Sequence, residues 1–74
     1  MIAVQCRMAR AALGWGVRDL AREASVSIDT ITRLEKGEAL LPRTVEAIQR
    51  ALEEAGVIFV DENGEGPGVR LKKR

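Results

Sequence analysis

The 74-residue sequence has no histidine, no tyrosine and a single cysteine, Cys6. One cysteine cannot close an internal disulfide, and without histidine the chain has no recognised set of zinc ligands, so we expect neither a metal nor another cofactor. The usual general bases are missing too, which argues against an enzyme of the acid–base or catalytic-triad type. We expect Cys6 to be a small core residue in a reducing cytoplasm; the alternative is a redox-sensing thiol.

Long apolar runs are also absent. The longest, Ala55–Val60, is far shorter than the roughly 20 residues of a membrane span, and the N-terminus lacks the pattern of a signal peptide. We therefore expect a cytoplasmic protein with no membrane partner and no small-molecule ligand. A chain of this length forms one small domain of marginal stability, and with disulfide and metal excluded the support left open is a second subunit.

Positive charge is scarce overall, because the net charge is only +1, and this by itself argues against nucleic-acid binding. The charge is unevenly distributed, however. Residues 1–36 carry a net charge of +2, residues 37–68 a net −5, and residues 69–74 a net +4 from Arg70, Lys72, Lys73 and Arg74. A function that needs positive potential would use the N-terminal half or the tail.

Apolar residues recur at helical spacing through the first 55 residues. The pattern predicts helices over residues 2–13, 17–24, 28–36 and 42–55, the first with an apolar stripe of Ile2, Cys6, Ala9 and Leu13. Glycines are placed to end three of these helices, at positions 14, 37 and 56, while Ser27 is a good N-cap for the third and Pro42 can begin the fourth. The fold class is therefore mainly α, with four to five helices.

The C-terminal residues have a different character. Residues 57–60 are β-branched or aromatic and residues 69–72 alternate apolar and basic, which predicts two short strands around a glycine-rich loop. We expect residues 57–74 to form a β extension of the same domain as residues 1–56. Two arrangements are open: a homodimer contact built by Val57, Ile58, Phe59 and Val60, or a hairpin that packs on the first and fourth helices of its own chain.

The second and third predicted helices are short and joined by a turn of three or four residues, which is the spacing of a helix-turn-helix. The segment from Leu13 to Gly37, LGWGVRDLAREASVSIDTITRLEKG, resembles the helix-turn-helix of the lambda-type phage repressor and Cro family, also called the XRE family. The resemblance rests on Leu20-Ala21, Val26-Ser27 and the closing residues Ile31, Leu34, Glu35 and Gly37, and it covers roughly residues 2–55.

Two positions depart from the family pattern. The family commonly has a glutamine at the position of Val17, where it touches a phosphate, and valine cannot form that hydrogen bond. The family usually has glycine at the position of Ser25, where a positive φ is common and a serine is strained.

The resemblance implies that the outward residues of the third helix contact DNA bases, here Ser27, Ile28, Asp29, Thr32 and Arg33. Arginine can bond guanine bidentately, isoleucine can press on a thymine methyl, and aspartate can accept from cytosine or merely serve the helix dipole. Phosphate contacts would come from Arg10, Arg18, Lys36 and Arg43 and from backbone N–H groups at the start of the second helix. For Arg10 the favoured alternative is a structural ion pair with Glu35, and for Trp15 it is a packing role.

The implied function is a sequence-specific DNA-binding transcriptional regulator, more specifically a repressor, in which the helix over residues 28–36 reads the major groove. The expected partners are double-stranded DNA with a palindromic operator and a second copy of the chain, with the two recognition helices roughly 34 Å apart. The alternative is an antitoxin-like or adaptor module that uses the same fold to bind a protein, which the acidic residues 37–68 favour.

Overall fold

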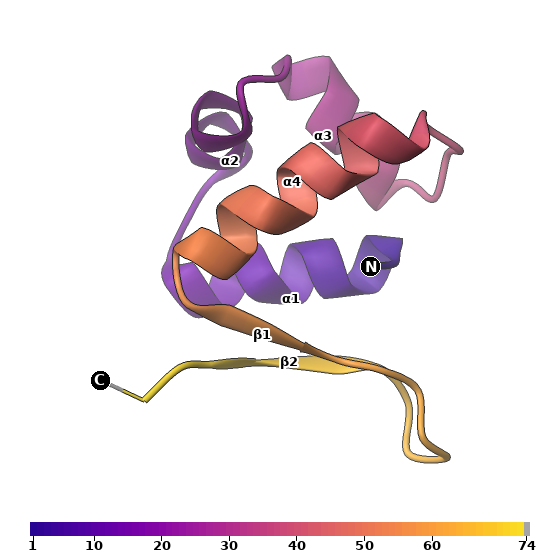
Figure 1. Cartoon of the computed structure of the whole chain (residues 1–74). Helices are drawn as coiled ribbons and strands as arrows, with labels where there is room; N and C mark the ends of the chain where they lie inside the picture. Colours follow the sequence, from indigo (N-terminus) through magenta and orange to yellow (C-terminus); the bar gives the residue numbers. More distant parts are fainter. Residues whose placement is uncertain (74) are drawn as a thin grey trace.

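The computed structural model describes residues 1–73, so Arg74 of the basic tail lies outside the described residues. The elements in chain order are α1 (Ala3–Leu13), α2 (Val17–Ala24), α3 (Ile28–Glu35), α4 (Pro42–Glu54), β1 (Val57–Val60) and β2 (Gly68–Leu71) (Figure 1). The predicted mainly α fold with a C-terminal hairpin is confirmed, with four helices, and each predicted boundary lies within one residue of the observed one. Across residues 1–73, no helix is long and apolar enough to cross a membrane.

The elements form three levels, with α2 and α3 at one end, α1 and α4 in the middle, and the hairpin at the opposite end (Figure 1). α2 packs on both α3 and α4, while α1 touches α3 on one side and β2 on another. The buried apolar side chains of all four helices and β1 meet in a single core made of Cys6, Ala9, Leu20, Ala21, Ala24, Ile31, Leu34, Ile48, Leu52 and Val57.

The two strands pair with each other in an antiparallel hairpin, with Val57 opposite Leu71 and Val60 opposite Gly68. Val57 is only 2% exposed, and Phe59 packs against the core, so this face of β1 covers its own helices. Of the two open arrangements, the strands therefore pair within one chain. Val57 and Phe59 are correspondingly unavailable to a second copy, which leaves the outward residues Ile58 and Val60 of the expected dimer contact.

The hairpin is fastened to α1 by a side chain that the apolar pattern did not single out. Gln5 is 4% exposed, and its Nε2 donates to the carbonyl oxygens of Val60 (3.1 Å) and Gly68 (3.0 Å), one on each strand. Its Oε1 accepts the N–H of Ile2 at 3.0 Å. Since a buried amide must have its hydrogen bonds satisfied, these contacts hold the hairpin in one position on α1.

The predicted apolar stripe of α1 is wrong at its first member. Ile2 is 52% exposed, because it precedes the first helical residue and its backbone is extended, with φ −110° and ψ 169°. A residue outside the helix does not follow the 3.6-residue periodicity that carries Cys6 and Ala9 into the core. Leu13, at the other end of the stripe, is half-buried and packs against the core.

The turn between α2 and α3 requires a left-handed residue at Ser25, whose φ is +57°. In that conformation its N–H and that of Val26 bond carbonyls at the end of α2, and Val26 packs against the core. Ser27 then caps α3, its side-chain oxygen accepting the N–H of Thr30 at 3.1 Å. The conformation of the turn therefore places backbone strain on Ser25.

Replacing that serine by glycine should relieve the strain. We expect Ser25→Gly to raise the free energy of unfolding by up to about 1 kcal/mol, because glycine adopts positive φ freely and loses only part of the gain to unfolded-state entropy. Urea-induced unfolding monitored by circular dichroism measures the change. The matched control is Glu23→Gly, an exposed residue inside α2, which should lower stability by about 1 kcal/mol. A Ser25→Gly variant less stable than the wild type would contradict the strain.

Candidate nucleic-acid interface

The packing of α2 and α3 leaves one face of α3 free. The two helices are joined by the three residues Ser25–Ser27, and their inward side chains, among them Leu20, Ile31 and Leu34, are buried in the shared core. The α3 side chains that project from the opposite side of the helix, such as Asp29 and Arg33, cannot reach the core, because successive residues are turned by about 100°. The helix is thus anchored by one face and open along the other.

The open face carries all five residues that the sequence assigns to base contacts. We call this set the recognition surface: Ser27, Ile28, Asp29, Thr32 and Arg33. Four of the five are exposed and Thr32 is half-buried. Ile28, in the first turn of α3, is 46% exposed, although isoleucine is among the residues most often buried. The structure therefore brings these residues together on one exposed helix face that could enter a major groove.

Besides Ser27, which caps the helix, two members of the recognition surface already have side-chain hydrogen-bond partners. Thr32 Oγ1 donates to the carbonyl oxygen of Ile28 at 3.1 Å, and Arg33 Nε donates to Glu38 Oε1 at 3.1 Å. Both side chains of the Arg33–Glu38 pair are nearly half exposed, at 45% and 49%. An exposed pair of this kind contributes about 0–1 kcal/mol to stability. It therefore positions the guanidinium and still allows it to exchange Glu38 for another partner. Glu38 was not identified from the sequence, since it lies beyond the end of α3 where no periodicity places it.

The start of α2 is occupied by an acidic residue. Asp19 Oδ2 accepts the N–H of Gly16 at 2.8 Å, and Asp19 Oδ1 lies 3.2 Å from Arg22 Nη2. The backbone hydrogen bond from Gly16, and then that from Arg22, hold the pKa of the Asp19 carboxyl below its usual value. One of the backbone N–H groups expected to bind phosphate is therefore already satisfied by a carboxylate. Val17, at the next position, is half-buried against the core.

Three of the four cations expected at the DNA backbone are exposed, namely Arg18, Lys36 and Arg43. Within residues 1–73, none of these three forms an ion pair, so their charges are unneutralised. Arg18 lies at the start of α2, Lys36 directly after α3 and Arg43 at the start of α4. They thus come from three different elements around the recognition surface.

The fourth cation, Arg10, is turned inward and bonded to Glu35. Arg10 Nε lies 2.6 Å from Glu35 Oε2, Nη2 lies 2.7 Å from Oε1, and Nη1 donates to the carbonyl oxygen of Trp15 at 3.2 Å. Its side chain is 19% exposed, and that of Glu35 is 9% exposed. We therefore drop the assignment of Arg10 as a phosphate contact, because a guanidinium held in this way cannot reach the surface without breaking a bidentate pair.

Two further residues of α1 complete the surroundings of Glu35. Cys6 Sγ donates to Glu35 Oε2 at 3.3 Å, and Arg7 Nη1 donates to the backbone carbonyl of Glu35 at 2.5 Å. Trp15 is half-buried and packs against the core, in the turn that Arg10 also bonds. The last turn of α3 is thus held by α1 through one carboxylate and one carbonyl.

Titration of these groups follows from their burial and partners. Burial alone would raise the pKa of Glu35, but the hydrogen bonds from Arg10 and Cys6 and the charges of Arg10 and Arg7 outweigh it, so the pKa lies below its usual value. Burial, the hydrogen bond to Glu35 and the negative charge of Glu35 raise the pKa of Cys6 to about 12. A thiol this reluctant to ionise is a poor nucleophile, which favours the core role of Cys6.

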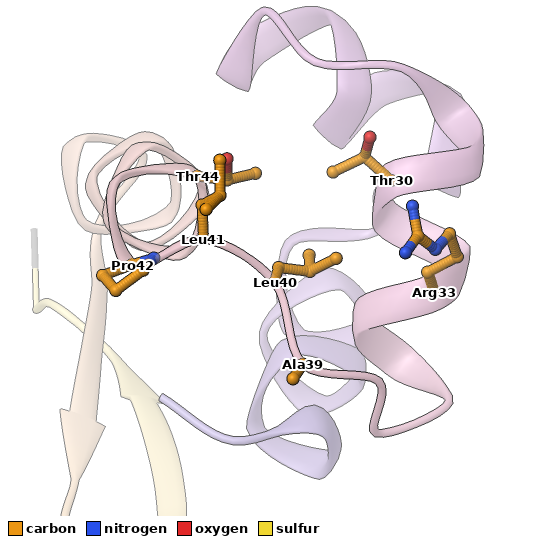
Figure 2. Close-up of a pocket in the computed structure, with 7 residues that line it drawn as sticks. All are labelled: Thr30, Arg33, Ala39, Leu40, Leu41, Pro42 and Thr44. Atoms are coloured by element: carbon orange, nitrogen blue, oxygen red, sulfur yellow. The ribbon is translucent and has the colours of Figure 1, made fainter.

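A shallow hollow of about 490 Å³ adjoins the recognition surface. Figure 2 shows Thr30 and Arg33 extending from α3 on one side of it, Leu41 and Thr44 from the start of α4 on the other, and Leu40 reaching from the connecting loop toward α3. Arg33 is therefore at the edge of an open depression, with space around its guanidinium. The start of α4, which carries Arg43, forms the far wall.

Comparison with known proteins places this geometry in a wider group. A family model described as a helix-turn-helix domain matches residues 2–57, a segment that contains all four helices and the first residue of β1. No curated protein matches the chain.

Neutralising Glu35 should destabilise the fold strongly. We expect Glu35→Gln to lower the free energy of unfolding at neutral pH by about 2–3 kcal/mol, because it leaves the largely buried Arg10 without its charge partner. The matched control is Glu38→Gln, which removes an exposed pair and should change stability by less than about 0.5 kcal/mol. Equal effects of the two substitutions in urea unfolding would contradict the special position of Glu35.

The same pair predicts an acid dependence. The folded-state pKa of Glu35 lies below its unfolded value, so its contribution is fully present above pH of about 4.3 and is lost as the pH falls through the lowered value. Unfolding measured from neutral pH downward should therefore show a steeper acid loss of stability in the wild type than in Glu35→Gln. Parallel pH profiles would contradict this assignment.

Proposed function

Because this chain belongs to the helix-turn-helix domain family, of the lambda-repressor-like type, we propose that it is a sequence-specific DNA-binding transcriptional regulator, and more specifically a repressor. The observation that carries the proposal is the recognition surface, one exposed face of α3 on which five side chains with base-reading chemistry lie together. Repression is the simplest outcome for such a domain, since occupying a promoter is sufficient for it.

In the proposed complex, α3 lies in the major groove. Arg33 leaves Glu38 and bonds the O6 and N7 atoms of a guanine, the strongest single discrimination available to this surface. Ile28 presses on a thymine methyl group, and Asp29 accepts from the amino group of a cytosine. Ser27 and Thr32, whose hydroxyls now bond within α3, contribute shorter contacts to a base or the sugar-phosphate backbone.

Arg18, Lys36 and Arg43 would neutralise phosphates on either side of the groove. Only three such contacts, two of them from residues 1–36 with a net charge of +2 and one from the acidic residues 37–68, predict a modest non-specific affinity with a shallow salt dependence. A homodimer would double these contacts. The palindromic operator expected from the sequence requires both recognition surfaces to face one duplex, so it depends on which surface joins the two copies.

Selection from a pool of random duplexes tests the function directly, and an enriched consensus sequence is the expected result. If no sequence is enriched and the chain captures a protein instead, the result supports the adaptor or antitoxin-like alternative and contradicts the proposed regulator.

Removing the guanidinium of Arg33 should cost both affinity and selectivity. We expect Arg33→Ala to weaken binding to the selected duplex by about 1–3 kcal/mol and to flatten the preference at one base pair. The control is Arg50→Ala, an exposed arginine in the half of α4 farther from α3 (Figure 1), where binding should change less than twofold. Fluorescence anisotropy with matched and single-base-changed duplexes measures both effects. An unchanged preference in Arg33→Ala would contradict its assigned contact.

Removing Glu38 should act in the opposite direction. Because Glu38 holds Arg33 by an exposed ion pair and adds negative charge beside the groove, we expect Glu38→Gln to tighten binding to the selected duplex by up to about fivefold, the equivalent of roughly 1 kcal/mol. The same anisotropy titration at low and high salt measures it, with the larger gain at low salt. Weaker binding in this variant would show that the pair assists DNA recognition.

A further inference from the structure

The two ends of the β1–β2 hairpin carry opposite charge. The tip, residues 61–67, contains the carboxylates of Asp61, Glu62 and Glu65 and no Lys or Arg. Residues 68–73, which return to the base of the hairpin, contain Arg70, Lys72 and Lys73 and no Asp or Glu. All six charged side chains are on exposed residues.

The tip is held in shape by its own polar groups, so its charges have a defined place. Glu62 Oε2 accepts the N–H groups of Gly64 and Gly66, at 3.3 and 2.6 Å, and Asn63 Oδ1 accepts the N–H of Glu65 at 3.3 Å. At the other end, the N–H of Lys72 donates to the carbonyl of Gly56 at 2.7 Å and closes the base of the hairpin.

Between these charged ends, the side of the hairpin that faces away from the helices is apolar. We call this side the outer hairpin face; by strand alternation it carries Ile58 and Val60 of β1 and Gly68 and Arg70 of β2. Ile58 is 39% exposed and does not pack against the core, unlike its neighbours Val57 and Phe59. Along this face the order is therefore the acidic tip, an apolar centre of Val60, Gly68 and Ile58, and a basic base that begins at Arg70, the cross-strand partner of Ile58.

A surface with this order is complementary to itself after a rotation of 180°. Two hairpins that pack outer face to outer face in opposite directions place each acidic tip on the partner's basic base and bury Ile58 of both copies between them. We propose that a second copy of this chain docks in this way, so that the outer hairpin face is an isologous dimer contact. The opposite charges set the direction of the pairing, and the apolar centre supplies the favourable burial.

The position of the hairpin gives this dimer a specific consequence. On α1, Gln5 bonds the hairpin while Arg7 bonds the end of α3, and residues two apart on a helix project about 200° from each other. The hairpin and α3 therefore lie on opposite sides of α1, as Figure 1 also shows. In a two-fold dimer joined at the hairpins, the two recognition surfaces face away from each other.

Such a dimer cannot place both copies of α3 in neighbouring major grooves of one straight duplex. The dimer presents its two recognition surfaces in opposite directions, so each surface would bind a separate DNA segment. The inference thus deepens the proposed function, on which its DNA part rests: the regulator bridges two operators, each read by one copy, and the operator need not be palindromic.

Charge reversal tests the dimer without DNA. One variant, Asp61→Lys/Glu65→Lys, makes both ends of the hairpin basic, and a second, Arg70→Glu/Lys72→Glu/Lys73→Glu, makes both ends acidic; none of these side chains forms a hydrogen bond or ion pair within residues 1–73. In sedimentation velocity we expect the wild type at twice its 8.1 kDa mass and each variant as a monomer. Dimers should return in an equimolar mixture of the two variants and in the chain that carries all five changes.

The chain with all five changes reports the direction of pairing. Tip-to-base pairing restores its dimer, whereas tip-to-tip pairing would leave like charges facing each other. Ile58→Glu should also be monomeric, while Leu41→Glu, a control at an exposed leucine remote from the hairpin, should remain dimeric. Circular dichroism verifies that each variant is folded. A wild type that is monomeric at every soluble concentration, or folded charge variants that stay dimeric, would overturn the dimer contact.

Bridging is measured with two duplexes of the selected sequence, one immobilised and one fluorescent. The wild type should retain the fluorescent duplex on the support, and Ile58→Glu should bind DNA without retaining it. Binding to both duplexes without retention by a dimeric wild type would overturn the outward arrangement. The two proposals can fail independently. If the chain is a dimer but selects no DNA sequence, only the proposed regulator is contradicted. If it selects a DNA sequence but the wild type is a monomer, only the hairpin dimer is contradicted.

Discussion

The structure depends on the bidentate pair between Arg10 and Glu35. It joins the last turn of α1 to the last turn of α3, two elements separated by two turns and α2 in the chain, and it is largely shielded from water. In so small a domain, a buried pair of this kind does what an apolar contact cannot, because its two hydrogen bonds have direction. It therefore sets the rotation of α3, and with it which residues form the recognition surface.

α1 connects the two ends of the molecule. On one side it bonds α3 through Arg7 and Arg10, and on the other it bonds both strands of the hairpin through Gln5. The helix itself begins without a side-chain hydroxyl cap and relies on Gln5 to satisfy the N–H of Ile2. Because the same short helix holds both ends of the molecule, the hairpin and the recognition surface are placed relative to each other by a few polar contacts.

Charge acts locally in this protein, and its net value of +1 conceals the arrangement. Within residues 1–73, Arg18, Lys36 and Arg43 form no ion pair, while Glu38 and Asp19 bond two groups expected to contact DNA, the guanidinium of Arg33 and the N–H of Gly16. The hairpin repeats the theme with opposite charges at its two ends. Exposed pairs such as Arg33–Glu38 are weak in water, so they can orient a side chain and still yield to a phosphate or a base.

The sequence by itself determined the elements, because their signals are local. The spacing of apolar residues predicts each helix, the capping chemistry of Ser27 and Pro42 predicts where two of them begin, and the departure from glycine at Ser25 predicts its strained backbone. The resemblance to the helix-turn-helix family selects the five side chains of the recognition surface. None of these inferences requires knowledge of a contact between distant residues.

Only the tertiary structure decided how those elements are joined and oriented. Gln5 finds its partners 55 and 63 positions away, and the guanidinium of Arg33 finds Glu38; of the two roles open to Arg10, the structure confirms the favoured ion pair with Glu35. Such pairings depend on how four helices pack, and polar side chains at the edge of an apolar stripe have the same local pattern whether they are buried or solvated. The spacing of apolar residues could not predict on which side of α1 the hairpin lies, because packing across the whole core determines that position.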